Sequence, residues 1–403
     1  MPVKGLALIS GGLDSALAVK VVQEAGADIE ALHFLGPFHT GAPAGAGGGG
    51  GTGGTGDAGG GGGGSAGAGT AAQEAVAQPG RPAAKGRDAA LVAAELGVPL
   101  HVHEFGDEYF DLLHAPAHGY GRGFNPCIDC RIYQFRIARG YMAKIGAAFL
   151  VTGEVLGQRP MSQHRQALDL IERESGLQGY VLRPLSAQLL APTVPEQRGW
   201  VDRALLFGIR GRSRREQYAL AARYGLTHFQ APAGGCRLTM PDFARRVRDL
   251  VAHGGRLDRL EAERLKVGRH LRLGERARAI VGRNQDENRR IGELGRPGDV
   301  YVAVRGHMGP LALGIGDVDE GALRLLAGVT ARYSDAPRDR EAEVAYRRVR
   351  PGARPPGEGD AAGATGAAGE TGAEDVEYAA TRSPDGVLAV LPAGDETIAP
   401  LRI

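Results

Sequence analysis

The sequence predicts an α/β fold with a doubly wound parallel sheet, followed by a smaller, basic α+β domain. Short apolar runs typical of buried strands, such as Gly5–Ile9, alternate with segments typical of helices. A glycine-containing turn joins this first strand to the first helix, as in sheets that bind ligands at the carboxyl ends of their strands. The segment from Val201 to Arg290 contains 21 Lys and Arg residues but only 10 Asp and Glu residues, so the later part of the chain is the basic one.

The first predicted elements alternate strand, helix, strand. After Gly5–Ile9 we predict a helix that begins at Ala16 and stops near Gly26, and then a strand at Ile29–Phe34. Further along we predict a helix at Asp88–Leu96, a strand at Pro99–Phe105, a helix at Ile132–Lys144, a strand at Phe149–Gly153 and a helix at Arg214–Tyr224. Helices that connect parallel strands cover the faces of the sheet, which is the doubly wound arrangement.

Two segments of low complexity interrupt this pattern. Of the 30 residues from Gly41 to Thr70, 18 are Gly, and such a segment buries too little apolar surface to offset its ordering entropy. We therefore expect a disordered insertion at about residues 40–80, within a first domain of residues 1–250. A basic domain at 251–350 follows, and 351–403 forms a low-complexity spacer and a tail, in which Val387–Leu391 is the candidate strand.

The composition excludes some classes of protein. No run of 18 apolar residues exists and the first residues lack a signal-peptide pattern, so we expect a cytoplasmic protein without a membrane partner. The formal net charge of +2 conceals the basic segment, which favours a polyanionic partner such as RNA. A solvated, Arg-rich surface is the alternative.

The turn after the first strand, Ser10–Ser15, has the features of a phosphate-binding turn. Gly11 and Gly12 let the backbone turn sharply and approach an anion. Amides at the helix N-terminus and the hydroxyls of Ser10 and Ser15 then bind phosphate oxygens. Asp14 would repel phosphate unless Mg²⁺ lay between them, so it favours a metal–nucleotide site. The alternative is an ordinary strand–turn–helix in which Ser and Asp cap the helix.

Three cysteines form the second candidate site. Cys127 and Cys130, which we place just before a helix, can face one ion from a single turn, and the distant Cys236 can supply a third ligand. Three thiolates leave tetrahedral zinc one ligand short, but they suit a [4Fe–4S] cluster with one open iron. Isolated buried cysteines, a zinc site completed by His118, and a thiol or persulfide relay between Cys127 and Cys236 remain alternatives.

Ser-Gly-Gly-Leu-Asp-Ser resembles the signature of the PP-loop ATP pyrophosphatases, the adenine nucleotide α-hydrolases of the HUP-like fold. The resemblance implies cleavage of ATP between its α and β phosphates, adenylation of a substrate oxygen and release of pyrophosphate. The wider sequence is similar to the tRNA thiouridine synthases, in their 4-thiouridine-synthase-like or 2-thiouridylase-like groups. Four segments within residues 3–250 carry that similarity: Pro126–Cys130, Thr152–Ser162, Arg183–Ala187 and Pro232–Thr239.

This resemblance implies a set of site residues. ATP and Mg²⁺ would be bound by Ser10, Gly11, Gly12, Asp14, Ser15, His33, Thr152 and Gly153, with the adenine near the His33–Phe34 strand. Asp14, Cys127 and Cys236 would be catalytic, and Cys127, Cys130 and Cys236 would hold the cluster. Arg131 and Arg159 are candidates for steering phosphate. The implied partners are tRNA and a sulfur donor, either sulfide or a cysteine desulfurase.

A second resemblance concerns the basic segment. Lys266–His270 and Val281–Asn284 resemble the RNA-binding module of NFACT ribosome-quality-control proteins. The 4-thiouridine synthases usually carry an N-terminal THUMP domain, which does not fit before a turn at residue 10, so we expect RNA capture by this later module. A basic appendage that only packs on the first domain is the alternative. An amidating ligase and a non-catalytic RNA-binding protein remain alternative functions, and a homodimer is one of the assemblies left open.

Overall fold

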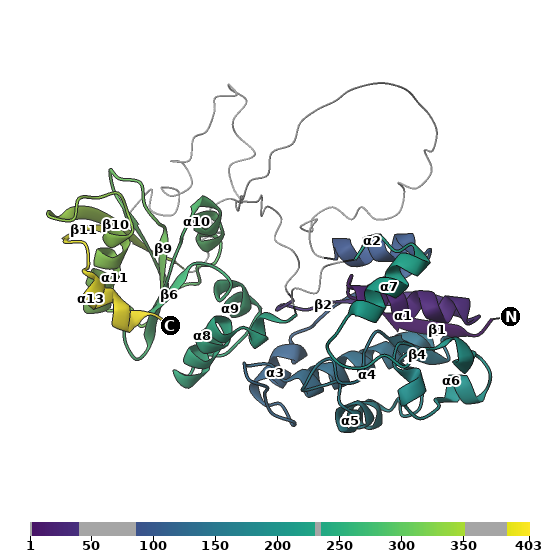
Figure 1. Ribbon diagram of the computed structural model, residues 1–403. Coiled ribbons are helices and arrows are strands. Elements are labelled where there is room, and N and C mark those ends of the chain that lie inside the picture. Colours follow the sequence, from purple (N-terminus) through teal and green to yellow (C-terminus); the bar gives the residue numbers. More distant parts are fainter. Residues whose placement is uncertain (1, 40–85, 230–234, 351–384) are drawn as a thin grey trace, which may run out of the picture.

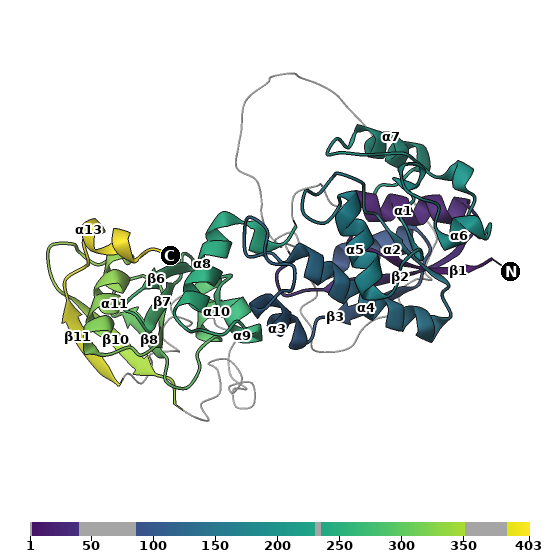
Figure 2. The same cartoon turned by 90° about the horizontal axis from the view of Figure 1, so that it is seen from below.

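A computed structural model describes residues 2–39, 86–229, 235–350 and 385–403. The insertion expected at about 40–80, the spacer that begins at 351 and the Pro232–Gly234 part of the third cysteine segment lie outside the described residues. The described chain forms two lobes, each built on one sheet, and helices α8 and α9 lie between them (Figures 1 and 2).

The first lobe contains a five-stranded parallel sheet, which confirms the predicted fold class. Its strand order is β3-β2-β1-β4-β5, so β1 is central and its carboxyl end lies between those of β2 and β4. The strands are β1 (Lys4–Leu8), β2 (Asp28–Leu35), β3 (Leu100–Glu104), β4 (Phe149–Thr152) and β5 (Val181–Leu182).

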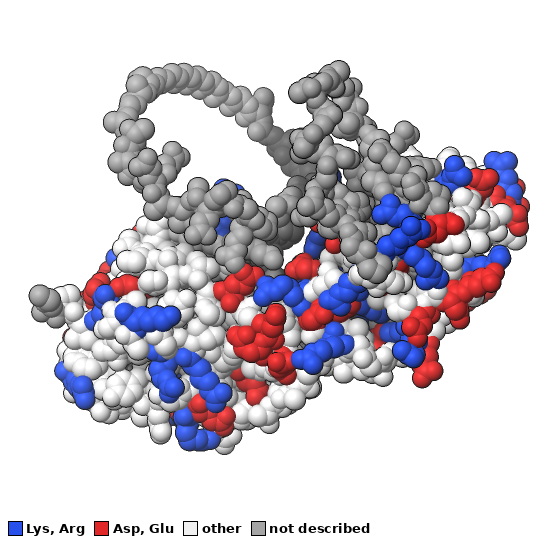
Figure 3. All heavy atoms as spheres, turned by 180° about the vertical axis from the view of Figure 1, so that it is seen from behind, with Lys and Arg blue, Asp and Glu red and all other residues white. Residues whose placement is uncertain are grey.

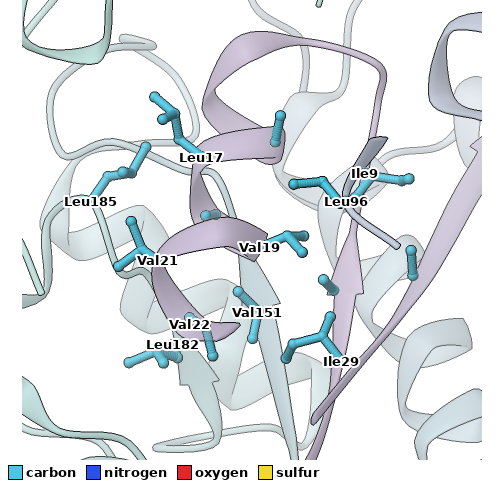
Figure 4. Close-up of a cluster of buried hydrophobic side chains, with 14 of the residues drawn as sticks. Ile9, Leu17, Val19, Val21, Val22, Ile29, Leu96, Val151, Leu182 and Leu185 are labelled. Atoms are coloured by element: carbon cyan, nitrogen blue, oxygen red, sulfur yellow. The ribbon is translucent and has the colours of Figure 1, made fainter. Parts of the chain in front are cut away.

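Helices cover both faces of this sheet because its buried strands alternate apolar side chains between the two faces. One core cluster joins Ala7 and Ile9 to α1, α2 and α7 (Figure 4), and the other joins Leu6 and Leu8 to α3, α4, α5 and α8. The helices of this lobe are α1 (Leu13–Glu24), α2 (Arg87–Glu95), α3 (Glu108–His114), α4 (Cys127–Ile145), α5 (Arg165–Ser175), α6 (Val194–Gln197), α7 (Arg215–Tyr224), α8 (Pro241–Ala252) and α9 (Arg259–Arg264).

The start of α4 corrects one prediction. Cys127 is the first helical residue, and the amide of Cys130 donates to the carbonyl of Pro126 at 2.9 Å, so the Cys-x-x-Cys pair forms the first helical turn and does not precede the helix. Pro126 fits this position because the N-cap residue needs no intrahelical amide donor. The two cysteines therefore lie three residues apart on one face of α4.

The second lobe is a six-stranded antiparallel sheet with helices, which confirms the predicted α+β character. Its order is β11-β10-β8-β9-β7-β6, and the strand predicted at Val387–Leu391 is β11 (Gly386–Val390), paired with β10. The α11 helix covers one face and α10 the other. The remaining elements are β6 (Arg269–Arg272), β7 (Ala277–Val281), α10 (Gln285–Gly292), β8 (Val300–Val304), β9 (Ala312–Gly316), α11 (Glu320–Arg332), β10 (Ala342–Arg348) and α13 (Asp395–Ile398).

Helix α8 connects the lobes through packing and ion pairs. Its apolar face, including Phe243, belongs to the core cluster of the first lobe, where Phe243 packs edge-on against Phe38 at 5.7 Å between ring centroids. Near its other end Asp249 forms an ion pair with Arg272 of β6. A second connection follows in α9, where Arg259 lies 2.9 Å from Glu104 of β3. On its other side, Glu261 of α9 forms an ion pair with Arg278 of β7, so both helices connect the two lobes.

Charges of both signs are mixed over the surface. Figure 3 shows Lys and Arg side chains interleaved with Asp and Glu side chains on the face that it presents. Many Lys and Arg side chains of the basic segment form ion pairs. Examples are Arg278 with Glu261 and Arg283 with Glu287. In the parts of the chain that the structure describes, no helix is long and apolar enough to cross a membrane.

Candidate nucleotide and thiol site

The turn between β1 and α1 is shaped by its two glycines. Gly11 has a φ of +80°, and a Cβ atom there would lie 2.8 Å from Cβ of Asp88, so this position requires glycine. Gly12 is the N-cap residue of α1 and has no side chain to cap the first helical turn. The Ser15 hydroxyl donates to the carbonyl of Gly12 at 2.8 Å and lies 3.4 Å from the Ser10 hydroxyl. Both hydroxyls therefore stand at the mouth of a helix N-terminus, where an anion is favoured.

The carboxylate of Asp14 is only half engaged. Its Oδ2 accepts a hydrogen bond from Gln158 Nε2 at 2.8 Å and lies 3.6 Å from Arg214 Nη2, but its buried Oδ1 has no partner among the described residues. Leaving a buried carboxylate oxygen unpaired is costly. The vacant hydrogen-bonding position fits a Mg²⁺ ligand, because Mg²⁺ prefers carboxylate oxygens in combination with phosphate oxygens.

Sequence reasoning missed three buried polar residues, of which Gln158 and Arg214 contact Asp14. Gln158 Oε1, Arg214 Nε and both amide atoms of Gln217 are buried without partners in the described structure, and Gln217 is 0% exposed. Arg214 and Gln217 lie three residues apart at the start of α7, which packs against α1. The unpaired groups of Gln158 and Arg214 therefore lie beside the phosphate-binding turn, and Gln217 lies about one helical turn further along α7. Burial of a polar side chain on an otherwise apolar helix face is a signal that the sequence alone does not contain.

His33 holds the backbone just before the phosphate-binding turn. Its Nδ1 lies 2.8 Å from the carbonyl oxygen of Ile9, and because a carbonyl only accepts, Nδ1 is the donor. Burial lowers the pKa of His33, which favours the neutral ring. The predicted nucleotide residue thus fixes the backbone that leads into the turn.

The predicted Thr152–Gly153 segment lies directly over the N-terminus of α1. A Cβ atom on Gly153 would lie 2.5 Å from the backbone of Asp14 and 2.6 Å from the amide nitrogen of Ser15, so only glycine allows this close approach. Thr152 is buried at the end of β4, next to β1 in the sheet. The structure therefore brings together all eight residues predicted to bind nucleotide.

Cys236 reaches the other two cysteines because its segment is held between two loops. It pairs with His39, which follows β2, and the amide of Arg237 donates to the Phe38 carbonyl at 2.8 Å. On its other side the amide of Phe124 donates to the Leu238 carbonyl at 2.8 Å. The Cys236 segment thus lies against the loop that follows the carboxyl end of β2, and β2 is the neighbour of β1, whose carboxyl end leads into the phosphate-binding turn.

The three thiols influence one another and are held by neighbouring donors. Asn125 Nδ2 donates to Cys127 Sγ at 3.0 Å, and Gln134 Nε2 donates to Cys130 Sγ at 3.4 Å. Burial raises the pKa of Cys130, and it raises the pKa of Cys236 to about 12, with the two other thiols adding to that increase. With the backbone contacts of the Cys236 segment, this mutual influence places the three thiols near one another, and we call the region around their side chains the thiol pocket.

The three thiols are candidate ligands for a metal. The three cysteines are free thiols. Among the described residues, no group of three or more His, Cys, Asp or Glu side chains is placed to hold a metal ion as they stand. The donor set nevertheless fits the predicted cluster in chemistry and number, since three thiols face one pocket and each iron of a [4Fe–4S] cluster takes one outside ligand.

His118 does not complete a zinc site. Its Nδ1 lies 3.0 Å from Asp129 Oδ1 and its Nε2 lies 3.2 Å from Glu174 Oε1. Both ring nitrogens therefore contact carboxylates, and neither points to the thiols. Arg131, a candidate for steering phosphate, forms an ion pair with the buried Glu154 at 2.8 Å. Arg159 lies beside Gly235, the residue before Cys236, since a Cβ atom on Gly235 would be 3.5 Å from Arg159 Nη1.

A parallel sheet whose first strand leads through a glycine turn into a helix N-terminus is typical of α/β nucleotide-binding units. Residues 268–354 match the family model of the NFACT protein RNA binding domain. A tRNA-specific 2-thiouridylase MnmA from Marinobacter nauticus is 31% identical over 116 residues, which are 27% of this chain and 29% of that protein. The corresponding protein from Syntrophotalea carbinolica is 37% identical over 78 residues, 18% of this chain and 22% of that protein.

The chain is thus a distant homologue of the tRNA thiouridylases of the PP-loop family, as its motifs indicated. It matches less than a third of the length of these two relatives. A 4-thiouridine synthetase solved with RNA and bound ATP is similar at 20% identity and a TM-score of 0.29, covering 55% of this chain and 51% of that one.

Proposed function

We propose that this protein uses ATP to replace an oxygen of a tRNA uridine with sulfur, in the cytoplasm. The observation that carries the proposal is that three thiols from two separate segments, the start of α4 and the Cys236 segment, come together at the sheet edge that also holds the phosphate-binding turn. An amidating ligase would leave these thiols unexplained. A non-catalytic RNA-binding protein would leave the unpaired groups around Asp14 unexplained.

The nucleotide site supports activation at the α-phosphate. The Ser10 and Ser15 hydroxyls and the first amides of α1 would bind phosphate oxygens, and Asp14 Oδ1 would hold Mg²⁺, which when bound would neutralise phosphate charge. The uridine carbonyl oxygen attacks the α-phosphorus, the bond to the bridging oxygen breaks, and pyrophosphate leaves. Arg214 and Gln217 offer hydrogen-bond donors to the departing pyrophosphate. The product is a base whose oxygen carries AMP.

The thiol pocket supports the second half of the reaction. Cys127, Cys130 and Cys236 would hold a [4Fe–4S] cluster, which when bound would supply an open iron for sulfide. Without a cluster, Cys236 would carry a persulfide whose outer sulfur attacks the activated carbon and displaces AMP. Cys127 would then attack Cys236 Sγ and break the sulfur–sulfur bond, so that the outer sulfur leaves with the thiolated base and a Cys127–Cys236 disulfide forms, which a thiol reductant must reopen. Sulfide would supply the sulfur for the cluster route, whereas in the persulfide route a cysteine desulfurase would transfer its own persulfide sulfur to the Cys236 thiol.

RNA capture falls to the second lobe in this proposal. The match of residues 268–354 to an RNA-binding domain supports tRNA as the partner, as do the thiouridylases to which the chain is similar. The deciding experiment is mass spectrometry of tRNA nucleosides from a deletion strain and from strains complemented with the native gene or Cys236→Ala.

We expect one thiolated nucleoside to vanish on deletion, to return with the native gene and to stay absent with Cys236→Ala. An unchanged nucleoside profile on deletion would contradict the proposal. Anaerobically purified protein separates the two sulfur carriers, because a cluster brings iron, acid-labile sulfide and broad visible absorbance.

A further inference from the structure

A buried carboxylate lies between the nucleotide site and the thiols. Glu154 is 1% exposed and follows Thr152–Gly153 directly. Its Oε2 accepts from Thr152 Oγ1 at 3.2 Å and from Arg183 Nε at 3.0 Å, and its Oε1 accepts from Arg131 Nε at 2.8 Å. Burial alone would raise the pKa of Glu154, but the two arginines outweigh burial and hold that pKa below its usual value. Glu154 is therefore an ionised group shared by three segments.

One arm of this arrangement leads to the thiols. Arg131, the residue after Cys130, uses its Nε for Glu154 and its Nη1 to donate to Gln134 Oε1 at 2.8 Å. The amide nitrogen of Gln134 in turn donates to Cys130 Sγ at 3.4 Å. A continuous set of hydrogen bonds thus joins Glu154 to one sulfur atom. Cys130, Arg131 and Gln134 all lie near the N-terminus of α4.

The other contacts lead to the nucleotide site and to a fixed support. Gly153 packs against the backbone of Asp14 and Ser15 so closely that a movement of the phosphate-binding turn must also move Thr152 and Glu154. On the far side Arg183 forms a second ion pair with Glu172 of α5. Glu154 is thus connected to the turn that would hold ATP, while Arg183 anchors it to a helix outside the site.

Stability alone does not explain this arrangement. A buried ion pair gains little over well-packed apolar residues, since desolvation opposes the attraction of the charges. What charged and hydrogen-bonded groups do provide is a defined geometry, because each donor in the set must meet its acceptor. The position of Arg131 and Gln134, and through them the Cys130 sulfur, is consequently set by Glu154.

We propose that Glu154 is a positioning residue that couples occupation of the nucleotide site to the orientation and reactivity of Cys130, acting through Arg131 and Gln134. The inference rests on the proposed function in that ATP is taken to bind at Ser10–Ser15. It adds that the two halves of the site communicate, so that the sulfur-bearing pocket responds when the nucleotide is in place. A merely structural Glu154 would hold α4 equally well with the nucleotide site empty or filled.

The test measures thiol reactivity directly and needs no RNA. Metal-free, full-length protein is treated with iodoacetamide at one pH, with and without Mg²⁺ and a non-hydrolysable ATP analogue, and mass spectrometry follows the labelling of Cys130. Binding of the analogue is measured separately by calorimetry. We expect the analogue to change the Cys130 labelling rate at least about threefold in the native protein. Arg131→Met should abolish that change while the Kd of the analogue stays within about threefold.

Two variants make the test specific. Arg136→Met removes an arginine from the same helix that contacts only the Glu174 carbonyl in the described structure, and it should keep the full response. Gln134→Leu breaks only the last link and serves where Arg131→Met does not fold, as judged by thermal melting. A response retained in Gln134→Leu or in folded Arg131→Met overturns the inference. So does a native protein that binds the analogue without any change at Cys130, whereas failure to bind the analogue contradicts the proposed function itself.

Discussion

The nucleotide turn and the thiol pocket share one edge of the sheet but differ in how their polar groups are satisfied. Around Asp14, the structure leaves Asp14 Oδ1, Gln158 Oε1 and the Gln217 amide without partners in the described residues. Around the thiols, Asn125, Gln134 and Tyr109 each contact a sulfur atom. Unpaired buried groups raise the free energy of the empty protein, while paired groups hold a fixed geometry.

This difference indicates how each half of the site operates. The nucleotide turn carries hydrogen-bonding capacity that only a polar ligand can use, so part of the binding free energy comes from relieving the unpaired state. The thiol pocket is already organised, and its raised pKa values keep Cys130 and Cys236 protonated until a metal, a charged group or a change of position favours the thiolate. The polar groups of the nucleotide turn are therefore fully paired only when a ligand is bound, whereas the protonation of the thiols is set by the groups around them.

The largest expected effect comes from Asp14→Asn. The amide has almost the same shape but cannot hold Mg²⁺ as a carboxylate does, so pyrophosphate release in the presence of tRNA should fall about 10²- to 10³-fold. The melting temperature should not fall, because Oδ1 has no protein partner to lose. Asp169→Asn, which changes an exposed carboxylate of α5, is the matched control and should keep full activity. Full activity in Asp14→Asn would remove the turn from the mechanism.

A smaller and opposite pair of effects is expected for Gln217→Leu. Replacing an unpaired buried amide with an apolar side chain should raise the free energy of unfolding of the ligand-free protein by about 1–3 kcal/mol. The same change should weaken ATP binding roughly 10-fold, because donors for the phosphates are lost. Chemical denaturation and calorimetry measure the two quantities.

Gln23→Leu provides the contrast for this prediction. Gln23 is a glutamine with a partner, since its amide donates to the Leu96 carbonyl at 3.1 Å. Its replacement should lower stability and leave ATP binding unchanged. If Gln217→Leu also lowers the free energy of unfolding and leaves the Kd for ATP unchanged, the Gln217 amide does not bind ATP.

The smallest effect concerns His118 and pH. The hydrogen bond that His118 donates to Asp129, with the charges of Asp129 and Glu174, raises the pKa of His118 above 6.5 in the folded protein. The stabilisation is fully present below the unfolded pKa of about 6.5 and is lost as the pH rises through the higher folded value. Thermal melting of metal-free protein between pH 5.5 and 9 should show this loss. His118→Gln should flatten it, and Arg136→Gln, which removes a non-titrating contact to Glu174, should not.

The nucleotide turn was predictable from sequence because its residues are contiguous and each has a local physical reason. Gly11 and Gly12 allow a sharp turn and Asp14 favours a cation, and the structure shows the sharp turn in the positive φ of Gly11. Gly153 lies far along the chain and was named only from the family resemblance. The parallel sheet followed from its apolar runs, although the two-residue β5 and helix α5 were not predicted. A strand as short as β5 carries no periodic signal.

The partners of Asp14 and Cys130 were not predictable from sequence. Gln158, Arg214 and Gln217 are ordinary polar residues until the packing of α7 on α1 buries them. Arg131 and Glu154 are likewise far apart along the chain and meet only because α4 covers the sheet next to β4. The start of α4 was misjudged by several residues, since Cys and Pro carry weak helical preference but are accepted in a first turn.

Cys236 and the second lobe lie on one continuous piece of backbone. Cys236 leads into a short 3₁₀ turn (Arg237–Thr239) and then into α8, whose 12 residues span about 18 Å and whose Asp249 holds Arg272. A stiff rod of fixed length therefore stands between a sulfur atom and the domain that matches RNA-binding proteins. If RNA is held by that domain, the distance between the domain and Cys236 would determine which nucleotide of the folded RNA reaches the sulfur, independently of the base sequence around that nucleotide.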